Sequence, residues 1–152
     1  MEEKAAPRQE LQVNIRNMRE GDIEEVLSID RKITGKNRAF TYDFSPLGGE
    51  LTLSVVAEAE GKIVGFLLGQ SSTSSYDATD IAIVQNIGVD PGYLHYHIGT
   101  RLMQFFVDCC KKRGLDSIHA MVRSQDDQLI PFLKSMEFIE GKLVEFVKPL
   151  KR

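Results

Sequence analysis

The chain has 152 residues, 42% of them hydrophobic and 27% charged, and its formal net charge at pH 7 is −3. Such a chain has the size of one globular domain, and its weak acidity lacks the basic footprint of nucleic-acid-binding proteins. Its only two cysteines are adjacent, which argues against a disulfide scaffold. Neither a signal peptide nor a run of about 20 apolar residues is visible. We therefore expect a cytoplasmic protein that binds neither nucleic acid nor a membrane.

The N-terminal third predicts an arm, a strand and a segment of mixed character. Residues 1–11 are mostly polar and charged, so we expect a flexible arm there and one domain over residues 12–152. Val13 and Ile15 alternate with polar residues, which indicates a strand. Residues 34–50 carry aromatic side chains among Gly and Pro, and they predict a short helix or a structured loop.

A helix is expected between these two segments. Asp22 is placed to cap its free N–H groups, and Glu25, three residues on, is the expected partner in a capping box. Apolar residues recur at helical spacing, which predicts one buried face, formed by Ile23, Val26, Leu27 and Ile33.

The middle of the chain predicts three strands. Residues 53–58 and 62–69 are rich in β-formers, and the Glu60-Gly61 pair between them indicates a hairpin. Residues 70–80 are rich in Ser and Thr without a helical period, so we expect a polar loop. The apolar run over residues 81–89 predicts another strand, which Asp90-Pro91-Gly92 must end in a turn.

The C-terminal half predicts a long helix over residues 98–113, which Gly114 is placed to end. One face of this helix is apolar and is formed by Leu102, Met103, Phe106, Cys109 and Cys110. A strand over residues 117–122, a helix over 126–136 and a final strand over 143–147 complete the order. This order of elements predicts an α/β fold with a mixed sheet.

The junction between residues 81–89 and the long helix is the segment whose pattern is typical of a ligand-binding site. A helix N-terminus offers unpaired N–H groups and about half a positive charge, which suits a phosphate or pyrophosphate. Gly99 lets a ligand approach the backbone closely, and the Thr100 hydroxyl can add a hydrogen bond. Because many strand–helix turns bind nothing, the pattern by itself leaves a purely structural turn open.

This junction resembles the acetyl-CoA loop of the GNAT N-acetyltransferases, which reads approximately Val-x-Pro-x-Tyr-Arg/Gln-x-x-Gly-x-Gly/Ala. Val89, Pro91 and Tyr93 stand in step with that pattern, and Gly99 stands as its second glycine. The resemblance extends from Asn14 to about Lys148, through Ile15-Arg16 and Asp22 at the opening and Lys134-Ser135-Met136-Glu137-Phe138 near the end. It implies a single-domain fold with a mostly antiparallel sheet of about six to seven strands and about four helices.

Four positions depart from the family pattern. Leu94 stands where the family prefers Arg or Gln, and His97 stands where it prefers its first glycine. If that position needs a positive φ, a side chain there costs about 1–2 kcal/mol, although His tolerates such angles better than most residues. Leu133 falls where many members carry a Tyr that protonates the leaving thiolate, and Glu137 replaces a common Gly.

The resemblance also implies a mechanism. The pantetheine arm would lie between residues 81–89 and 117–122, paired with backbone near Ile87 and Val89, and an N–H near Val89 would polarise the thioester carbonyl that a substrate amine attacks. Asp126 stands at the position of a family Asn that touches the arm. The cofactor contacts that we expect are Ile87, Val89, Leu94, His95, Tyr96, His97, Ile98, Gly99, Thr100 and Asp126.

No catalytic acid or base is assigned, because Gln85 and Asn86 stand where some relatives place a general-base Glu. The adjacent cysteines on the long helix are interpreted as small core residues. His95 and His97 lack a third ligand at a recognised spacing, so we expect no metal site.

The implied function is acetyl-CoA-dependent N-acetylation of a primary amine on a small molecule or protein. The alternatives are a non-catalytic acyl-CoA-binding or regulatory module on the same fold, and an interaction domain that does not bind CoA. A homodimer is the oligomer that we consider, since dimers are the commonest.

Overall fold

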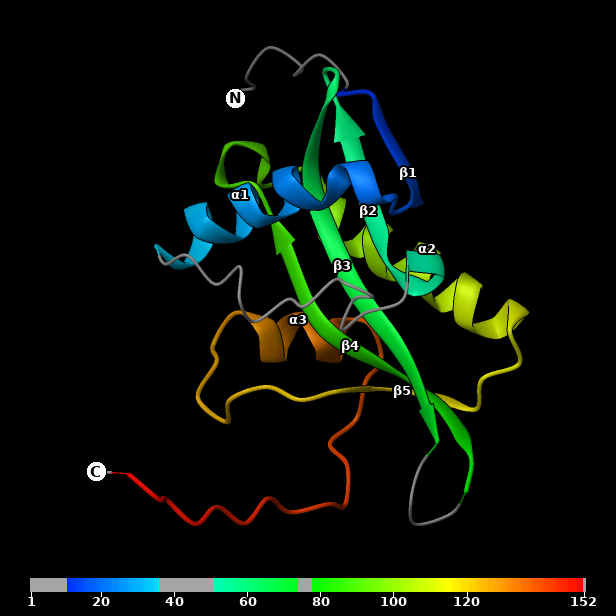
Figure 1. The fold of residues 1–152 in the computed structure, drawn as a ribbon, viewed down its shortest axis with the longest axis vertical. Coiled ribbons are helices and arrows are strands. Elements are labelled where there is room, and N and C mark those ends of the chain that lie inside the picture. Colours follow the sequence, from blue (N-terminus) through cyan, green and yellow to red (C-terminus); the bar gives the residue numbers. More distant parts are fainter. Residues whose placement is uncertain (1–10, 36–50, 74–77, 152) are drawn as a thin grey trace, which may run out of the picture. The chain divides into compact units, whose positions relative to one another are not determined.

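The computed structural model describes residues 11–35, 51–73 and 78–151 (Figure 1). These ranges form one sheet in the order β1-β2-β3-β4-β5, antiparallel throughout except for the parallel β4–β5 pair. The strands are β1 (Val13–Asn17), β2 (Val55–Ala59), β3 (Lys62–Thr73), β4 (Asp80–Val89) and β5 (Ser117–Ala120). The α-helices are α1 (Ile23–Thr34), α2 (Ile98–Lys112) and α3 (Leu129–Ser135).

The mixed α/β architecture is as predicted, but the element counts are not. The described ranges hold five strands and three α-helices, whereas about six to seven strands and about four helices were expected. The chain also divides into two compact units, the first ending at Met121 and the second beginning at Val122. The expected arm, apart from Leu11, and the helix or loop over residues 36–50 lie outside the described residues.

The β2–β3 hairpin confirms the turn predicted at Glu60-Gly61. Ala59 pairs with Lys62, so the loop has two residues, and both take positive φ, 54° at Glu60 and 77° at Gly61. Two residues with φ above zero make the turn type whose twist matches the flanking strands. In contrast, the polar loop expected over residues 70–80 is wrong in its first part, because β3 continues to Thr73 and pairs there with the start of β4.

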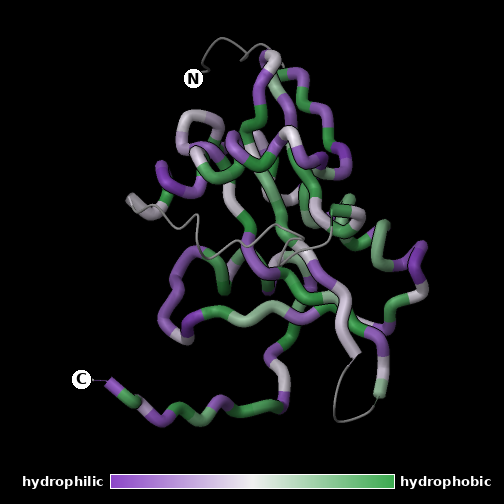
Figure 2. The backbone as a smooth tube through the Cα atoms, viewed as in Figure 1, coloured by the Kyte–Doolittle hydropathy of each residue, from purple (hydrophilic) through white to green (hydrophobic). Residues whose placement is uncertain are grey.

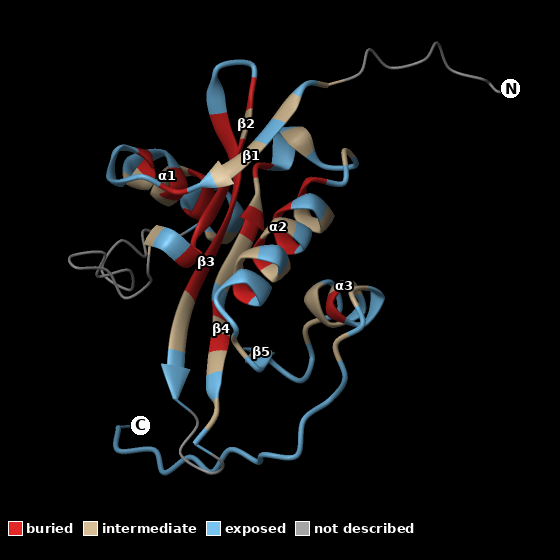
Figure 3. Cartoon of the chain, turned by 90° about the vertical axis from the view of Figure 1, so that its right-hand side faces the viewer, coloured by how far each residue is buried: buried red, intermediate tan, exposed pale blue. Residues whose placement is uncertain are grey.

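The core lies on both faces of the sheet in the first unit. On one face α1 packs against the strands through a buried cluster of Met18, Val26, Ile29, Val56, Ile63, Phe66 and Leu68. On the other face α2 buries Ile98, Leu102, Met103, Phe106 and Cys110. Figures 1 and 3 show the two helices on opposite sides of the sheet, with buried residues concentrated in β2, β3 and α2.

The close approach of α2 requires a residue without a side chain on β3. A Cβ atom at Gly69 would lie 2.6 Å from the carbonyl oxygen of Leu53 and would also collide with the ring of Phe106. Since the Leu53 oxygen is a backbone atom and cannot move aside as a side chain can, glycine at this position lets both the segment around Leu53 and the Phe106 ring of α2 pack closely on β3.

The start of α1 differs from the predicted capping box. The side chain of Asp22 makes no cap hydrogen bond to the helix. Instead, its carboxylate accepts from both terminal nitrogens of Arg16, at 2.8 and 2.9 Å, and from the backbone N–H of Arg19 at 2.7 Å. The carboxylate of Glu25 accepts from the N–H of Ile63 on β3 at 3.0 Å. Both carboxylates therefore tie the helix to the sheet, which a local capping rule does not anticipate.

Arg16 is the centre of this charged cluster. Its Nε also donates to Glu58 Oε1 at 3.0 Å, so one guanidinium joins β1, β2 and the residue that precedes α1. The bidentate bond from Arg16 holds the pKa of Asp22 below its usual value, and the same guanidinium lowers the pKa of Glu58. The hydrogen bond to Asp22, and to a smaller extent the one to Glu58, raises the pKa of Arg16 in turn.

The buried face of α1 is shifted relative to its prediction. Val26, Ile29 and Asp30 are buried, while Ile33, expected in the core, is 46% exposed. Ile23 packs against the edge of the cluster and Leu27 is half-buried. Helical spacing predicted the centre of the buried face correctly at Val26. At its C-terminal end the helix buries Asp30, whereas the sequence predicted Ile33 there.

The second unit holds α3 and the C-terminal segment. α3 spans seven residues, shorter than the expected 126–136, and Pro131 lies in its first turn, where a missing N–H costs no helical hydrogen bond. Glu137 follows the helix with φ of 70°, which accounts for the glycine that the family prefers there.

The final strand expected over residues 143–147 is wrong. The segment forms no strand, and Figure 2 shows hydrophobic residues recurring along this end of the chain. Its large apolar side chains are exposed, namely Ile139, Leu143, Val144, Phe146, Val147 and Leu150. An apolar run forms a strand only when a partner supplies the ladder hydrogen bonds, and no described strand pairs with this segment.

No helix within the described ranges has both the length and the apolar character that crossing a membrane requires.

Candidate cofactor site

The outer edge of β4 is paired over only part of its length. β5 pairs with Ile81–Val84, whereas β3 stays paired with β4 as far as Val89. Past Val84, none of the described strands occupies the side of β4 that faces away from β3. Figure 1 shows β4 running on past the end of β5. The gap that the family resemblance implied for a cofactor arm would lie along this open edge.

A β-bulge marks the point where the pairing with β5 stops. Leu68 of β3 faces Asn86, and the next residue, Gly69, faces Val84, so Gln85 is an extra residue on β4. Its side chain donates to Gln70 Oε1 at 2.5 Å. Since a bulge bends its strand and increases the local twist, it directs the rest of β4 away from β5.

Hydrogen bonds on β4 show which backbone groups face the open edge. The N–H of Asp90, directly after β4, donates to the carbonyl of Val64 in β3 at 2.8 Å. Successive N–H groups along a strand alternate in direction, so those of Ile87 and Val89 point away from β3. The N–H of Ile87 accordingly bonds outside the ladder, to the side-chain oxygen of Asn86 at 2.9 Å. Both backbone contacts that the sequence predicted for the arm therefore lie on the exposed edge.

Asp90 fixes the turn that follows β4. Its Oδ1 accepts from the N–H of Gly92 at 2.9 Å, and its Oδ2 lies 2.9 Å from Nζ of Lys32 on α1. Burial alone would raise the pKa of the Asp90 carboxyl, but the Gly92 N–H and the Lys32 ammonium bring the pKa below its usual value. The sequence predicted the turn without this anchor, for which the Asp-Pro-Gly order is the available signal.

Tyr93 fastens the same turn to the β2–β3 hairpin. Its hydroxyl donates to Glu60 Oε1 at 2.5 Å, and the ammonium of Lys62 lies 5.1 Å from the centre of its ring. The interaction with Tyr93 raises the pKa of Lys62. This tyrosine matches the family pattern, and here it holds the loop in place.

Residues 94–97 carry the side chains expected to surround the phosphates. Leu94, His95 and His97 are exposed and Tyr96 is half-buried. His95 has φ of 73° and His97 has φ of 59°, both in the left-handed region. The position where the family prefers its first glycine thus does need a positive φ, and a histidine occupies it.

Among the residues that the structure describes, no side chain caps the N-terminus of α2. His97 precedes the helix without a side-chain hydrogen bond to it, and the first turn holds no acidic residue. Ile98 is buried and anchors the helix, while Gly99 and Thr100 are half-buried. The first-turn N–H groups and the positive end of the helix dipole therefore suit an anion.

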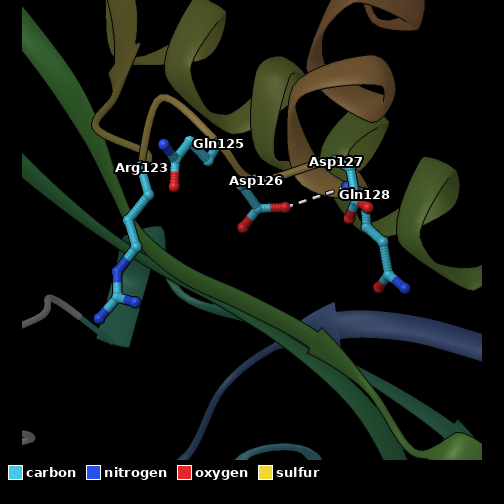
Figure 4. A pocket seen from close by; sticks show the side chains of 5 residues that line it. All are labelled: Arg123, Gln125, Asp126, Asp127 and Gln128. Carbon is cyan, nitrogen blue, oxygen red and sulfur yellow. Dashed lines mark hydrogen bonds between the residues drawn. The ribbon is translucent and has the colours of Figure 1, made fainter.

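Asp126 is the one expected contact that belongs to the second unit. Its Oδ1 accepts from the N–H groups of Gln128 and Leu129, at 3.1 and 2.7 Å, and so caps the start of α3 (Figure 4). It lines a pocket of about 390 Å³ together with Arg123, Gln125, Asp127 and Gln128. This carboxylate has a structural task that the sequence did not predict.

The described part of the chain offers little support for a cysteine nucleophile, a catalytic histidine or a metal site. Burial raises the pKa of the Cys110 thiol to about 11, so it is protonated at neutral pH and packs as a small apolar group. His119 is exposed and its ring lies 2.8 Å from the Ser117 hydroxyl. No cluster of three or more His, Cys, Asp or Glu side chains that could hold a metal ion occurs among the residues described.

Comparison with known proteins identifies a sequence family. The sequence profile of the acetyltransferase (GNAT) family matches residues 22–138. A probable N-acetyltransferase named camello, from Xenopus tropicalis, is 40% identical over 63 residues, which are 41% of this chain and 27% of that protein. A ribosomal-protein alanine N-acetyltransferase from Escherichia coli is 28% identical over 100 residues, 66% of this chain and 64% of that protein. The chain thus spans less than two thirds of the length of these curated relatives.

Solved structures share the fold. An aminoglycoside N-acetyltransferase in complex with CoA superimposes with a TM-score of 0.76 at 15% identity, over 97% of this chain and all of that chain. At this identity the likeness concerns the fold alone.

Proposed function

Because the chain belongs to the acetyltransferase (GNAT) family, we propose that it binds acetyl-CoA and transfers the acetyl group to a primary amine of a small molecule or protein. The observation that carries the proposal is the open edge of β4, which leads through one anchored turn to the uncapped N-terminus of α2. An extended amide-containing arm can pair with the edge, and a pyrophosphate can bind the helix.

The proposed contacts use the open edge of β4, the loop that follows it and the first turn of α2. The N–H of Val89 and the edge around Ile87 would bond the pantetheine arm, and the first-turn N–H groups at Ile98, Gly99 and Thr100 would bond the phosphates. Leu94, His95, Tyr96 and His97 would surround them. The loop needs no arginine for this task, because backbone N–H groups and the helix dipole supply the positive potential.

The proposed reaction is a direct transfer. The neutral amine nitrogen attacks the thioester carbonyl carbon, and its electron pair forms the C–N bond while the carbonyl π electrons move to oxygen. The tetrahedral intermediate then collapses, the C–S bond breaks, and the thiolate of CoA leaves and takes up a proton, as the amine nitrogen loses one. An N–H on the open edge of β4 stabilises the anionic oxygen of the intermediate.

The acceptor is proposed at the level of chemical class. The names of the relatives refer to an alanine of a ribosomal protein and to aminoglycosides, and both kinds of acceptor carry primary amines. Asp126 is retained as a contact to the arm only as a proposal, since its Oδ1 already caps α3. We further propose a single domain over residues 12–152, a cytoplasmic location and a homodimer, and light scattering would test the last of these.

Calorimetric titration with acetyl-CoA tests the binding site. Gly99→Glu places a negative charge at the helix start, so we expect the affinity to fall by about tenfold or more. Gln104→Glu adds the same charge to an exposed position further along α2 and should change affinity less than about twofold. No binding by the wild-type protein at millimolar ligand, or no loss in Gly99→Glu, would contradict the proposal.

A thiol-release assay separates the enzyme from a non-catalytic acyl-CoA-binding module. With acetyl-CoA and a panel of amines and peptides, the enzyme releases CoA above background in an amine-dependent manner. The module favoured by Leu133 and by the amides Gln85 and Asn86 would bind acetyl-CoA and release none.

A further inference from the structure

The side chain of Asn86 bridges α1 and the open edge of β4. Its Nδ2 donates to Asp30 Oδ1 at 3.3 Å, and its Oδ1 accepts from the N–H of Ile87 at 2.9 Å. A carboxylate accepts and an N–H donates, so these two partners together fix which end of the amide faces which side. The carbonyl oxygen of Asn86 therefore faces the backbone of β4.

Asp30, which holds this side chain, is buried in the core. Asp30 is only 2% exposed and follows the core residue Ile29 on α1. Gln85, the neighbouring amide at the bulge, is exposed and bonds Gln70 instead of a backbone N–H. Of the two amides at the bulge, Asn86 is thus the one whose oxygen occupies an N–H of the open edge.

An amide oxygen on the Ile87 N–H resembles a ligand carbonyl in chemistry and in distance. A C=O group 2.9 Å from this donor makes the hydrogen bond that a thioester oxygen would make there. Resting on the proposed function, we propose that Asn86 is a positioning residue whose oxygen fills the Ile87 N–H until the thioester carbonyl of acetyl-CoA displaces it.

The exchange has a consequence for catalysis. When the neutral thioester oxygen replaces the neutral Asn86 oxygen, one hydrogen bond substitutes for another, and the ground state gains little. When the amine attacks and the electron pair moves onto that oxygen, the N–H bonds an anion, and charge-assisted bonds are about twice as strong. The Ile87 N–H therefore stabilises the transition state more than bound acetyl-CoA. The displacement of Asn86 costs the same in both states, so it weakens the binding of acetyl-CoA and leaves this preference unchanged.

The test compares acetyl-CoA with S-ethyl-CoA, a thioether of equal length without the carbonyl oxygen. In the wild-type protein the two dissociation constants should agree within about twofold, because the carbonyl only replaces Asn86. Asn86→Leu removes the competing oxygen at similar volume, and we expect acetyl-CoA to bind about threefold to tenfold more tightly than S-ethyl-CoA. Gln85→Leu is the matched control and should retain the wild-type ratio.

The outcomes separate the inference from the proposed function. If neither ligand binds the wild-type protein, the proposed function fails and the inference fails with it. If both bind and the ratio in Asn86→Leu equals that of the wild-type protein, or Gln85→Leu raises it equally, only the inference is overturned.

A measurement on the wild-type protein covers the case in which Asn86→Leu does not fold. The side-chain NH₂ resonances of Asn86 should move on titration with acetyl-CoA and move much less with S-ethyl-CoA. Equal shifts with the two ligands would overturn the displacement of Asn86 by the carbonyl.

Discussion

The two halves of the sheet, β1–β2–β3 and β4–β5, differ in how completely the backbone groups of their strands are paired. On the β1–β2–β3 side, β2 pairs with β1 and with β3 over its whole length, and the residues of β3 from Ile63 to Gly69 are buried. On the β4–β5 side, pairing stops at Val84, and the strand continues to Val89 with one edge open. The first side therefore supplies stability, while the second presents the hydrogen-bonding groups that a ligand can use.

The difference arises from local features of the chain. Tight packing on the closed side depends on glycine at position 69 and on the charged cluster around Arg16. The open side depends on a bulge at Gln85 and on a turn held by Asp90. Variants at these features should therefore affect stability on one side and binding on the other.

Gly69→Ala should have the largest effect on the closed side. The added Cβ would meet the backbone oxygen of Leu53 and the ring of Phe106 on α2, so the segment around Leu53, α2 or the sheet must shift, and we expect a loss of about 3 kcal/mol in the free energy of unfolding. Urea denaturation measures this loss. Gly21→Ala is the control, since nothing lies within 4 Å of the added atom, and equal stability of the two variants would refute the packing account.

Arg16→Leu should cost about 2 kcal/mol at pH 7, because it leaves the nearly buried carboxylate of Asp22 without its bidentate partner. Lys32→Leu removes an exposed ammonium from buried Asp90 on the open side, and Asp90 keeps its bond from the Gly92 N–H, so the change should cost less than about 1 kcal/mol. Urea denaturation of both variants compares the two sides directly. A larger loss in Lys32→Leu would reverse the comparison.

The Arg16 cluster also predicts how stability depends on pH. Folding lowers the pKa values of Asp22 and Glu58, so their contribution is complete above their ordinary values, about 4. It is lost as pH falls through the lower values of the folded state. The free energy of unfolding of the wild-type protein should fall below pH about 4, and that of Arg16→Leu should fall less. Parallel pH profiles would contradict the assignment.

His97→Gly should have the smallest effect, a gain of up to about 1 kcal/mol. The residue has φ of 59°, which glycine adopts without strain. Leu94→Gly, in the same loop at φ of −69°, lacks this benefit and should lose about 0.5–1 kcal/mol through the greater freedom of the unfolded chain. Thermal unfolding gives both values, and the same sign for both variants would disprove the role of φ.

Sequence patterns predicted the elements of the closed side and the anchored turn well. The hairpin at Glu60-Gly61, the turn at Asp90 and the end of α2 at Gly114 follow from residues that dictate local φ and hydrogen bonding. The same reasoning failed for the capping role of Asp22, because Arg16 lies on a different element and competes for the carboxylate.

Long-range features account for the other failures. The strand expected over residues 143–147 has a suitable apolar composition, but a strand exists only with a partner, which no local pattern specifies. In the site, the backbone contacts at Ile87 and Val89 stay a prediction, whereas the Asp30–Asn86 bridge was not predicted. Its two residues are far apart in the sequence and meet only through the packing of α1 on the sheet.

Amide NMR shifts on titration with acetyl-CoA test the central claim most directly. The account predicts large shifts for Ile87, Val89 and the first turn of α2, with small shifts over the β2–β3 turn at Glu60-Gly61. Binding with the largest shifts on the β1–β2–β3 side, and none along β4 or at Ile98–Thr100, would contradict it.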